Sequence, residues 1–215
     1  GAAEEQASAT IIATGIGGLP TITQAQSVLQ TRGAKRLSAF TVPAFLANLA
    51  AGNVSIKYRL KGPLGTPVTA CAAGIQAIGD AMRLIKCGEA SIALAGGTEA
   101  CVDPLALAGF GALKALSTDN DAPHTASRPF DKTRAGFVMG EGAGLVVLES
   151  LAHAKTRGAK ALVEVVGYGT SADAYHLTSG PQSGEGAARA IKAAIKMADI
   201  KPGEIGYINA HATST

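Results

Sequence analysis

Two short motifs of this 215-residue chain carry residues that could do covalent chemistry. The first is VTACAAG, in which Cys71 lies between a strand-like approach and a helical pattern. A thiol at the first turn of a helix lies near the positive end of the helix dipole and near unpaired N–H groups, which favour the thiolate. Cys71 could therefore be a nucleophile, with a backbone N–H beside it to stabilise an oxyanion. A buried structural thiol is an equally open alternative, because free cysteine is often buried.

His211, in the second motif NAHATST, is the best candidate for the base or hydrogen-bond donor that such a nucleophile needs. It follows the apolar segment IGYI, and strand ends in α/β folds commonly carry sites. The alternative is a loop histidine that its backbone neighbours satisfy. No two histidines have metal-ligand spacing, so the sequence predicts no metal site. Cys87 and Cys101 lack the setting of Cys71, and for them we expect burial and a structural role.

The elements that must position these residues alternate between strand-like and helical patterns, which predicts an α/β fold with a parallel or mixed sheet. Hydrophobic residues make up 47% of the chain and Trp is absent, so the core must be built from small and aliphatic side chains. In the helix after Cys71, an apolar stripe is expected to face that core: Ile75, Ile78, Met82 and Ile85. The expected strands cover residues 9–15, 68–71, 90–100 and 144–150, residues 162–173 are expected to form a strand and a turn, and residues 205–215 a strand that runs into a loop. The expected helices cover residues 22–32, 71–87, 151–161 and 184–200.

Charge and cysteine content limit the class of protein. The net charge of +3 is too small and too scattered to indicate a nucleic-acid partner, although a modest basic patch could meet an acidic one. The sequence has no apolar run of about 18 residues and no signal-peptide pattern, so we expect no membrane segment. Three cysteines without CxxC spacing indicate a reducing compartment, and the predicted location is the cytoplasm.

Five motifs in this order resemble the elongating β-ketoacyl–acyl carrier protein synthases: VTACAAG, AGGTEA, RPFDKTRAGFVMGEGAG, GYGTSADAYHLT and YINAHATST. The resemblance covers about residues 11–215. It implies a thiolase-like fold of alternating α-β-α-β-α layers, incomplete in this chain, and a homodimer. Residues 1–155 would form most of the N-terminal half, and residues 156–215 the start of the C-terminal half.

The resemblance implies that Cys71 accepts an acyl group as a thioester and that His211 is the first of two active-site histidines. Malonyl–acyl carrier protein would then lose carbon dioxide, and the resulting enolate would attack the Cys71 thioester, lengthening a fatty acyl chain by two carbons. No cofactor is needed. The family's lysine, second histidine and gating loop would lie beyond Thr215, so we expect a longer polypeptide.

The resemblance also assigns roles to other residues, and each of them has a purely structural alternative. Thr213 and Thr215 match threonines that bind the pantetheine arm, and Ile16 and Phe110 match residues that line the acyl tunnel. Ordinary loop hydroxyls and core packing are the alternatives. The resemblance also assigns three basic residues to the surface that faces acyl carrier protein, where a solvated face is the alternative: Lys35, Arg36 and Lys114.

Two further interpretations stay open. A thiolase shares the fold and the nucleophile but condenses coenzyme A thioesters without decarboxylation, and the HATST and MGEGAG motifs disfavour it. A noncatalytic partner of a ketosynthase lacks the nucleophile, so Cys71 argues against that interpretation. The glycine motif TGIGGL lacks the GxGxxG pattern and the P-loop lysine, which favours a tightly packed strand end over a phosphate loop.

Overall fold

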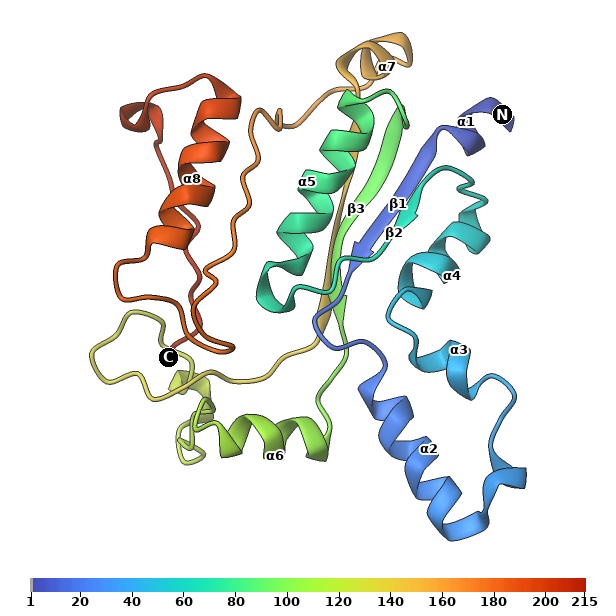
Figure 1. Ribbon diagram of the computed structural model, residues 1–215, viewed down its shortest axis with the longest axis vertical. Coiled ribbons are helices and arrows are strands. Elements are labelled where there is room, and N and C mark those ends of the chain that lie inside the picture. The colour runs from blue at the N-terminus through green and yellow to red at the C-terminus, as the bar shows by residue number, and fades with distance from the viewer. Residues whose placement is uncertain (1) are drawn as a thin grey trace.

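The sheet is built around β1, Ser8–Ala13, whose six residues are all buried. A strand that is covered on both faces has no solvent-exposed side, so its sequence does not alternate between polar and apolar residues. In the computed structural model, which describes residues 2–215, β1 pairs in parallel with β2, Leu64–Gly65, and with β3, Ile92–Glu99. The fourth strand, β4, Gly142–Glu149, pairs antiparallel with β3. The order β2-β1-β3-β4 gives the mixed sheet that the sequence predicts (Figure 1).

Helix α5, Ala73–Lys86, packs on this sheet through its alanines. Ala73, Ala77 and Ala81 are spaced four residues apart and are nearly inaccessible to solvent, so they form one row that meets β1 and β3. The expected apolar stripe is partly wrong, because Ile75 is 70% exposed. Small side chains let the helix approach the strands closely, and the larger residues Ile78 and Ile85 only border the core.

The α-helices besides α5 are α1 (Ala2–Gln6), α2 (Leu19–Arg32), α3 (Thr41–Phe45), α4 (Leu49–Tyr58), α6 (Pro104–Ala112), α7 (Leu151–Thr156) and α8 (Glu185–Ala198). Among these helices, α1 and α4 contact β1, whereas α2, α3, α6 and α8 lie farther from the strands (Figure 1). None of the helices within residues 2–215 is long and apolar enough to cross a membrane. Four short 3-10 helices are η1 (Ala34–Arg36), η2 (Ala70–Ala72), η3 (Pro123–Thr125) and η4 (Pro202–Glu204).

Three expected strands are wrong. Residues 68–71 enter the η2 turn, and the strand before it, β2, is only two residues long. Residues 162–173 and 205–215 run without strand pairing among the described residues, and a strand exists only where a neighbour completes its hydrogen-bond ladder. The first of these segments packs instead on α8, where a Cβ at Gly167 or Gly169 would collide with helix carbonyls.

Tyr168 joins this later part of the chain to α5. Its ring is 8% exposed and lies over Gly79, where a Cβ would overlap the ring. The guanidinium of Arg83 stacks 4.8 Å from the ring centroid, a cation–π geometry. Burial raises the pKa of the Tyr168 hydroxyl, with a further contribution from Asp80. Through Tyr168, the segment after residue 155 therefore packs directly on α5, which lies before it in the chain.

Glu149, the last residue of β4, is expected to make stability depend on pH. Hydrogen bonds from Arg157 and His153 lower its pKa from 4.5 to about 2, and its side chain is only 13% exposed. Because the folded-state pKa is depressed, this contribution is present above about pH 4.5 and is lost as pH falls toward 2. Glu149→Gln should lower the free energy of unfolding by about 1–2 kcal/mol at pH 7.

The measurement is urea unfolding at several pH values. The difference between wild type and Glu149→Gln should shrink as pH falls and approach zero only below about pH 2, where Glu149 is also protonated in the folded protein. Glu164→Gln, at an exposed position, is the matched control and should change stability little at any pH. A Glu149→Gln deficit that does not vary with pH would contradict the assigned ion pair.

Candidate active site

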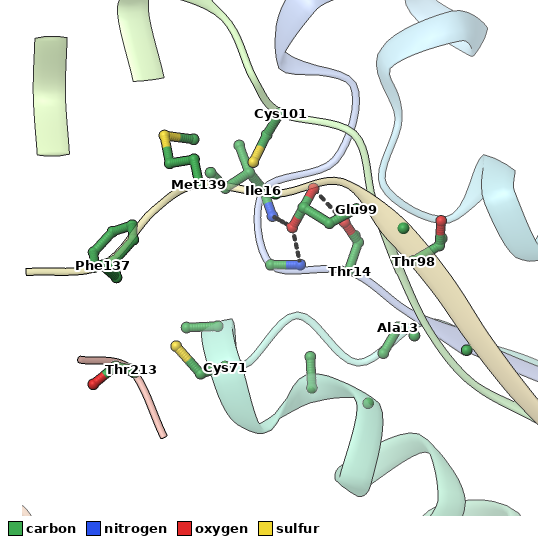
Figure 2. Close-up of a pocket in the computed structure, with 18 of the residues that line it drawn as sticks. Ala13, Thr14, Ile16, Cys71, Thr98, Glu99, Cys101, Phe137, Met139 and Thr213 are labelled. Atoms are coloured by element: carbon green, nitrogen blue, oxygen red, sulfur yellow. Dashed lines mark hydrogen bonds between the residues drawn. The ribbon is translucent and has the colours of Figure 1, made fainter. Parts of the chain in front are cut away.

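A cavity of about 770 Å³ lies where β1 and β3 end and where β4 and α5 begin. These ends meet because β1 and β3 are parallel while β4 runs antiparallel to β3. Its lining is mostly apolar or glycine, so it suits an apolar ligand more than a charged one. The side chains drawn in Figure 2 that bear most on its chemistry are Ile16, Cys71, Glu99, Cys101, Met139 and Thr213.

Cys71 lies at this cavity on the η2 turn, immediately before α5 (Figure 2). The turn is tight: Ala70 has φ +49°, which is unusual for a residue with a side chain, and the Ala72 N–H donates to the Thr69 carbonyl at 3.1 Å. Cys71 is exposed to the cavity space and to solvent. The buried structural thiol is therefore wrong for Cys71, and its role as the nucleophile stays a prediction. The helix expected from residue 71 begins at Ala73.

The two other cysteines differ from each other. Cys101 follows β3, is 6% exposed and lines the same cavity. Burial raises the pKa of its thiol, and the nearby carboxylates of Glu99 and Glu141 raise it further, so Cys101 is disfavoured as a nucleophile. The expected burial of Cys87 is wrong, because this residue caps the C-terminus of α5 and is exposed.

Aromatic and aliphatic side chains form one wall of the cavity. Phe110, from α6, and Phe137 contact each other edge to face, with ring centroids 5.2 Å apart and an angle of 80° between the planes. Ile16 follows β1 and also lines the cavity. The structure thus brings Ile16 and Phe110 to the same cavity as Cys71, as the expected tunnel requires, although their contact with an acyl chain stays a prediction.

Thr213 lines the cavity, whereas Thr215 does not, and their hydroxyls lie 2.6 Å apart. Between them, Ser214 is 2% exposed with φ +69°. Its carbonyl accepts the Gly136 N–H at 2.9 Å, and its hydroxyl accepts the Arg128 N–H at 3.0 Å. These bonds hold Thr213 at the cavity from a loop that lies far earlier in the chain. Sequence reasoning missed them.

His211 is exposed and is not among the residues that line the cavity, although its neighbours Ala212 and Thr213 are. Its cooperation with Cys71 therefore stays a prediction. Lys35 and Arg36 lie on η1, and Lys114 follows α6; all three are exposed. The elements that carry them, η1 beyond α2 and the end of α6, lie apart in Figure 1, so a single patch also stays a prediction.

Glu99 is a cavity residue that sequence reasoning did not single out. It lies at the end of β3, and its carboxylate accepts hydrogen bonds from Thr14, Gly15 and Ile16. The loop TGIGGL is therefore a tightly packed strand end, as expected. Within residues 2–215, His, Cys, Asp and Glu form no group of three or more suited to a metal ion.

Comparison with known proteins identifies the family of this chain. A family profile described as "Beta-ketoacyl synthase, N-terminal domain" matches residues 1–154, and one described as "Beta-ketoacyl synthase, C-terminal domain" matches residues 162–215. The 3-oxoacyl-[acyl-carrier-protein] synthase 2 of Rhizobium meliloti (strain 1021) is 54% identical over 214 residues, which are 99% of this chain and 51% of that protein. A mitochondrial 3-oxoacyl-[acyl-carrier-protein] synthase of Arabidopsis thaliana is 47% identical over 99% of this chain and 46% of its own length.

Solved structures agree with this assignment. A β-ketoacyl synthase from Burkholderia phymatum STM815 matches with a TM-score of 0.91 and 37% identity, over 99% of this chain and 51% of that one. A type II PKS ketosynthase in complex with its acyl-carrier protein matches with the same TM-score and identity, over 53% of that chain. These neighbours confirm the expected thiolase-type α/β fold, and the chain spans about half the length of the relatives it matches. With both family profiles matched in order along its length, the chain belongs to the β-ketoacyl synthase family.

Proposed function

We propose that the protein containing this chain is an acyltransferase that condenses an acyl thioester held on Cys71 with malonyl–acyl carrier protein, adding two carbons to a fatty acyl chain. The observation that carries this proposal is the position of Cys71 on a tight turn beside a cavity of about 770 Å³ with a mostly apolar lining. A nucleophile is useful there because an acyl chain can lie in the cavity while its thioester carbon remains at the sulfur.

The proposed reaction has two parts. First, the Cys71 thiolate attacks the acyl carbonyl, a bond to Sγ forms, and the carrier thiol leaves. Next, malonyl–acyl carrier protein loses carbon dioxide, and the electron pair of the broken C–C bond becomes an enolate, which His211 stabilises with a hydrogen bond. The enolate carbon then attacks the Cys71 thioester, and the cysteine thiolate leaves. Thr213 and Thr215 hold the pantetheine arm, and the chemistry uses no cofactor.

Partners and domain roles follow from the same proposal. Acyl carrier protein is the macromolecular partner, supported by the solved neighbour that contains a ketosynthase with its carrier protein. Residues 1–155 supply the nucleophile and residues 156–215 the first histidine. A homodimer is supported by large apolar side chains exposed on α3, α4 and β2, which a second subunit could cover: Val42, Ile56 and Leu64. A cytoplasmic location stays a prediction.

The two alternative functions predict different substrates. A thiolase would accept acetyl coenzyme A without releasing carbon dioxide, and a noncatalytic partner would form no thioester at all. The full-length protein should instead release carbon dioxide from malonyl–acyl carrier protein. The test compares carbon dioxide release and β-ketoacyl product among malonyl–acyl carrier protein, malonyl coenzyme A and acetyl coenzyme A. Condensation of acetyl coenzyme A alone would favour the thiolase function.

Replacing His211 by alanine should separate the two parts of the reaction. We expect malonyl decarboxylation to fall by about 10²–10³-fold, the usual cost of removing one donor to a developing oxyanion. Acylation of Cys71 should persist, because its turn at the start of α5 does not involve His211. Stopped reactions analysed by intact mass report the acyl-enzyme, and carbon dioxide release reports the second part. Equal loss of both would mean that His211 serves the nucleophile itself.

Reversing the charge at Lys35 and Arg36 should weaken recognition of the acidic carrier protein. The expected result for Lys35→Glu/Arg36→Glu is about a tenfold increase in KM for carrier-protein substrates, which shrinks as salt is added. Lys192→Glu/Lys196→Glu, at two exposed positions of α8, is the matched charge reversal and should have a smaller effect. If small thioesters without the carrier lose activity equally, the two residues act through folding.

A further inference from the structure

Glu99 binds the loop that follows β1 with both oxygens of its carboxylate. Oε2 accepts the Gly15 N–H at 2.7 Å and the Ile16 N–H at 3.0 Å, and Oε1 accepts the Thr14 hydroxyl at 3.1 Å. Figure 2 draws these three bonds as dashed lines beside the cavity. A carboxylate bound by two adjacent N–H groups is a charge-assisted contact, stronger than a bond between neutral groups.

The same loop is tight around this contact. A Cβ at Gly15 would lie 2.8 Å from Glu99 Oε2, so only glycine lets the carboxylate come this close. Gly17 has φ +84°, and its N–H donates to the Thr14 hydroxyl at 3.0 Å. On the far side, the Gly18 N–H donates to the Phe45 carbonyl at 3.3 Å. The loop is therefore held at its end by Phe45 and in its middle by Glu99.

Ile16 is the side chain that this loop presents to the cavity. It lies near Met139 and Cys101, across the cavity from Cys71 (Figure 2). Ile16 is 40% exposed, so packing around this residue is incomplete. The position of its Cα, from which the side chain enters the cavity, depends on its backbone N–H, which donates to Glu99.

We propose that Glu99 is a positioning residue: by binding the N–H groups of Gly15 and Ile16, it holds the Ile16 side chain as a wall opposite Cys71 and so limits the length of chain that the cavity accepts. The identification of the natural ligand as an acyl chain rests on the proposed function. The wall itself does not, because Ile16 and Cys71 line opposite sides of one cavity whichever apolar chain is attached at Cys71. Glu99 acts through Ile16 and takes no part in bond making.

The test measures alkylation of Cys71 in the full chain by iodoacetamides that carry short or long linear alkyl tails. The thiolate displaces iodide, and peptide mass mapping gives a rate constant for each cysteine. Cys87 is exposed and outside the cavity, so it reports the intrinsic reactivity of each reagent in the same molecule. The quantity compared is the long-to-short ratio at Cys71, divided by the same ratio at Cys87.

Glu99→Ala should raise this normalised ratio by about tenfold, within the range by which an apolar pocket discriminates between chains of different length. Glu99→Asp draws the carboxylate back by one methylene and should raise it less, which keeps the test valid if Glu99→Ala does not fold. Glu99→Gln keeps an acceptor for the two N–H groups and should resemble the wild type. Glu141→Ala is the control, because Glu141 accepts the Val102 N–H and does not bind the Ile16 loop.

Ile16→Ala decides whether Glu99 acts through Ile16. It should raise the ratio by itself, and adding Glu99→Ala to it should have little further effect. An unchanged or lower ratio in Glu99→Ala and Glu99→Asp, or full additivity with Ile16→Ala, would overturn the proposal. Failure of the proposed function looks different, since Cys71 would then be alkylated with this dependence on tail length but would form no thioester from acyl–acyl carrier protein.

Discussion

Replacing Cys71 by alanine is expected to lower acyl transfer in the full-length protein by about 10⁴-fold or more, the scale seen when a nucleophile is removed from a covalent mechanism. The reason is positional. Cys71 lies on the η2 turn at the cavity, whereas Cys101 lines the same cavity with a thiol whose pKa is raised by burial. Because burial raises the pKa of Cys101, little of its thiol is ionised at neutral pH, and we expect it not to replace Cys71. Single-turnover transfer of a labelled acyl group from its carrier measures the effect.

Two matched variants sharpen this prediction. Cys87→Ala removes an exposed thiol outside the cavity and should leave the rate within about twofold of wild type. Cys71→Ser keeps the shape of the side chain but has a hydroxyl that is a much poorer nucleophile, so it should resemble Cys71→Ala. Substantial acyl transfer by Cys71→Ala would mean that another group forms the thioester.

Gly79→Ala is expected to be strongly destabilising for a single added methyl group, costing about 3 kcal/mol in the free energy of unfolding. The methyl would overlap the ring of Tyr168, which is 8% exposed and also contacts the Arg83 guanidinium. The ring would have to move, and the packing between α5 and the segment after residue 161 would open. Denaturant unfolding of the full chain measures the loss.

Gly109→Ala in α6 is the control, because a Cβ there meets nothing within 4 Å. Alanine is the better helix former, so this variant should be about 1 kcal/mol more stable. Replacing the ring in Gly79→Ala/Tyr168→Leu should recover part of the loss, which tests the clash directly. Equal stability of Gly79→Ala and Gly109→Ala would contradict the packing described for Tyr168.

Local patterns were enough to predict most of the elements that position the cavity. The buried run at 9–15, the segment 90–100 and the helical periodicity after residue 71 predicted β1, β3 and α5 close to their observed bounds. The face of α5 was less predictable. Its spacing of large apolar residues favoured Ile75, but close approach to the sheet selected the alanine row, a choice that depends on distance between elements and not on periodicity.

Contacts between distant parts of the chain could not be predicted from the sequence. Glu99 and Gly15 are 84 residues apart, and Arg128 and Ser214 are 86 apart, so no local spacing marks either bond. The same limit explains the expected strands at 162–173 and 205–215. Their apolar patterns resemble strands, but pairing requires a neighbouring strand, and residues 2–215 supply none for them. Cys71 was a candidate because part of its signal is local, a thiol at the start of a helix among small residues. That signal alone left a buried thiol equally open, and only the structure shows that Cys71 is exposed.

The central claim is that Cys71 carries the acyl group, and the most direct test maps that group on the protein. The full-length protein is incubated with acyl–acyl carrier protein in the absence of the malonyl substrate, so that the acyl-enzyme accumulates. It is then digested under acidic conditions that preserve thioesters, and the peptides are analysed by mass spectrometry. The account predicts an acyl adduct on the peptide that contains Cys71 and none on the peptides with Cys87 or Cys101. An adduct on either of those two cysteines, with Cys71 unmodified, would contradict it.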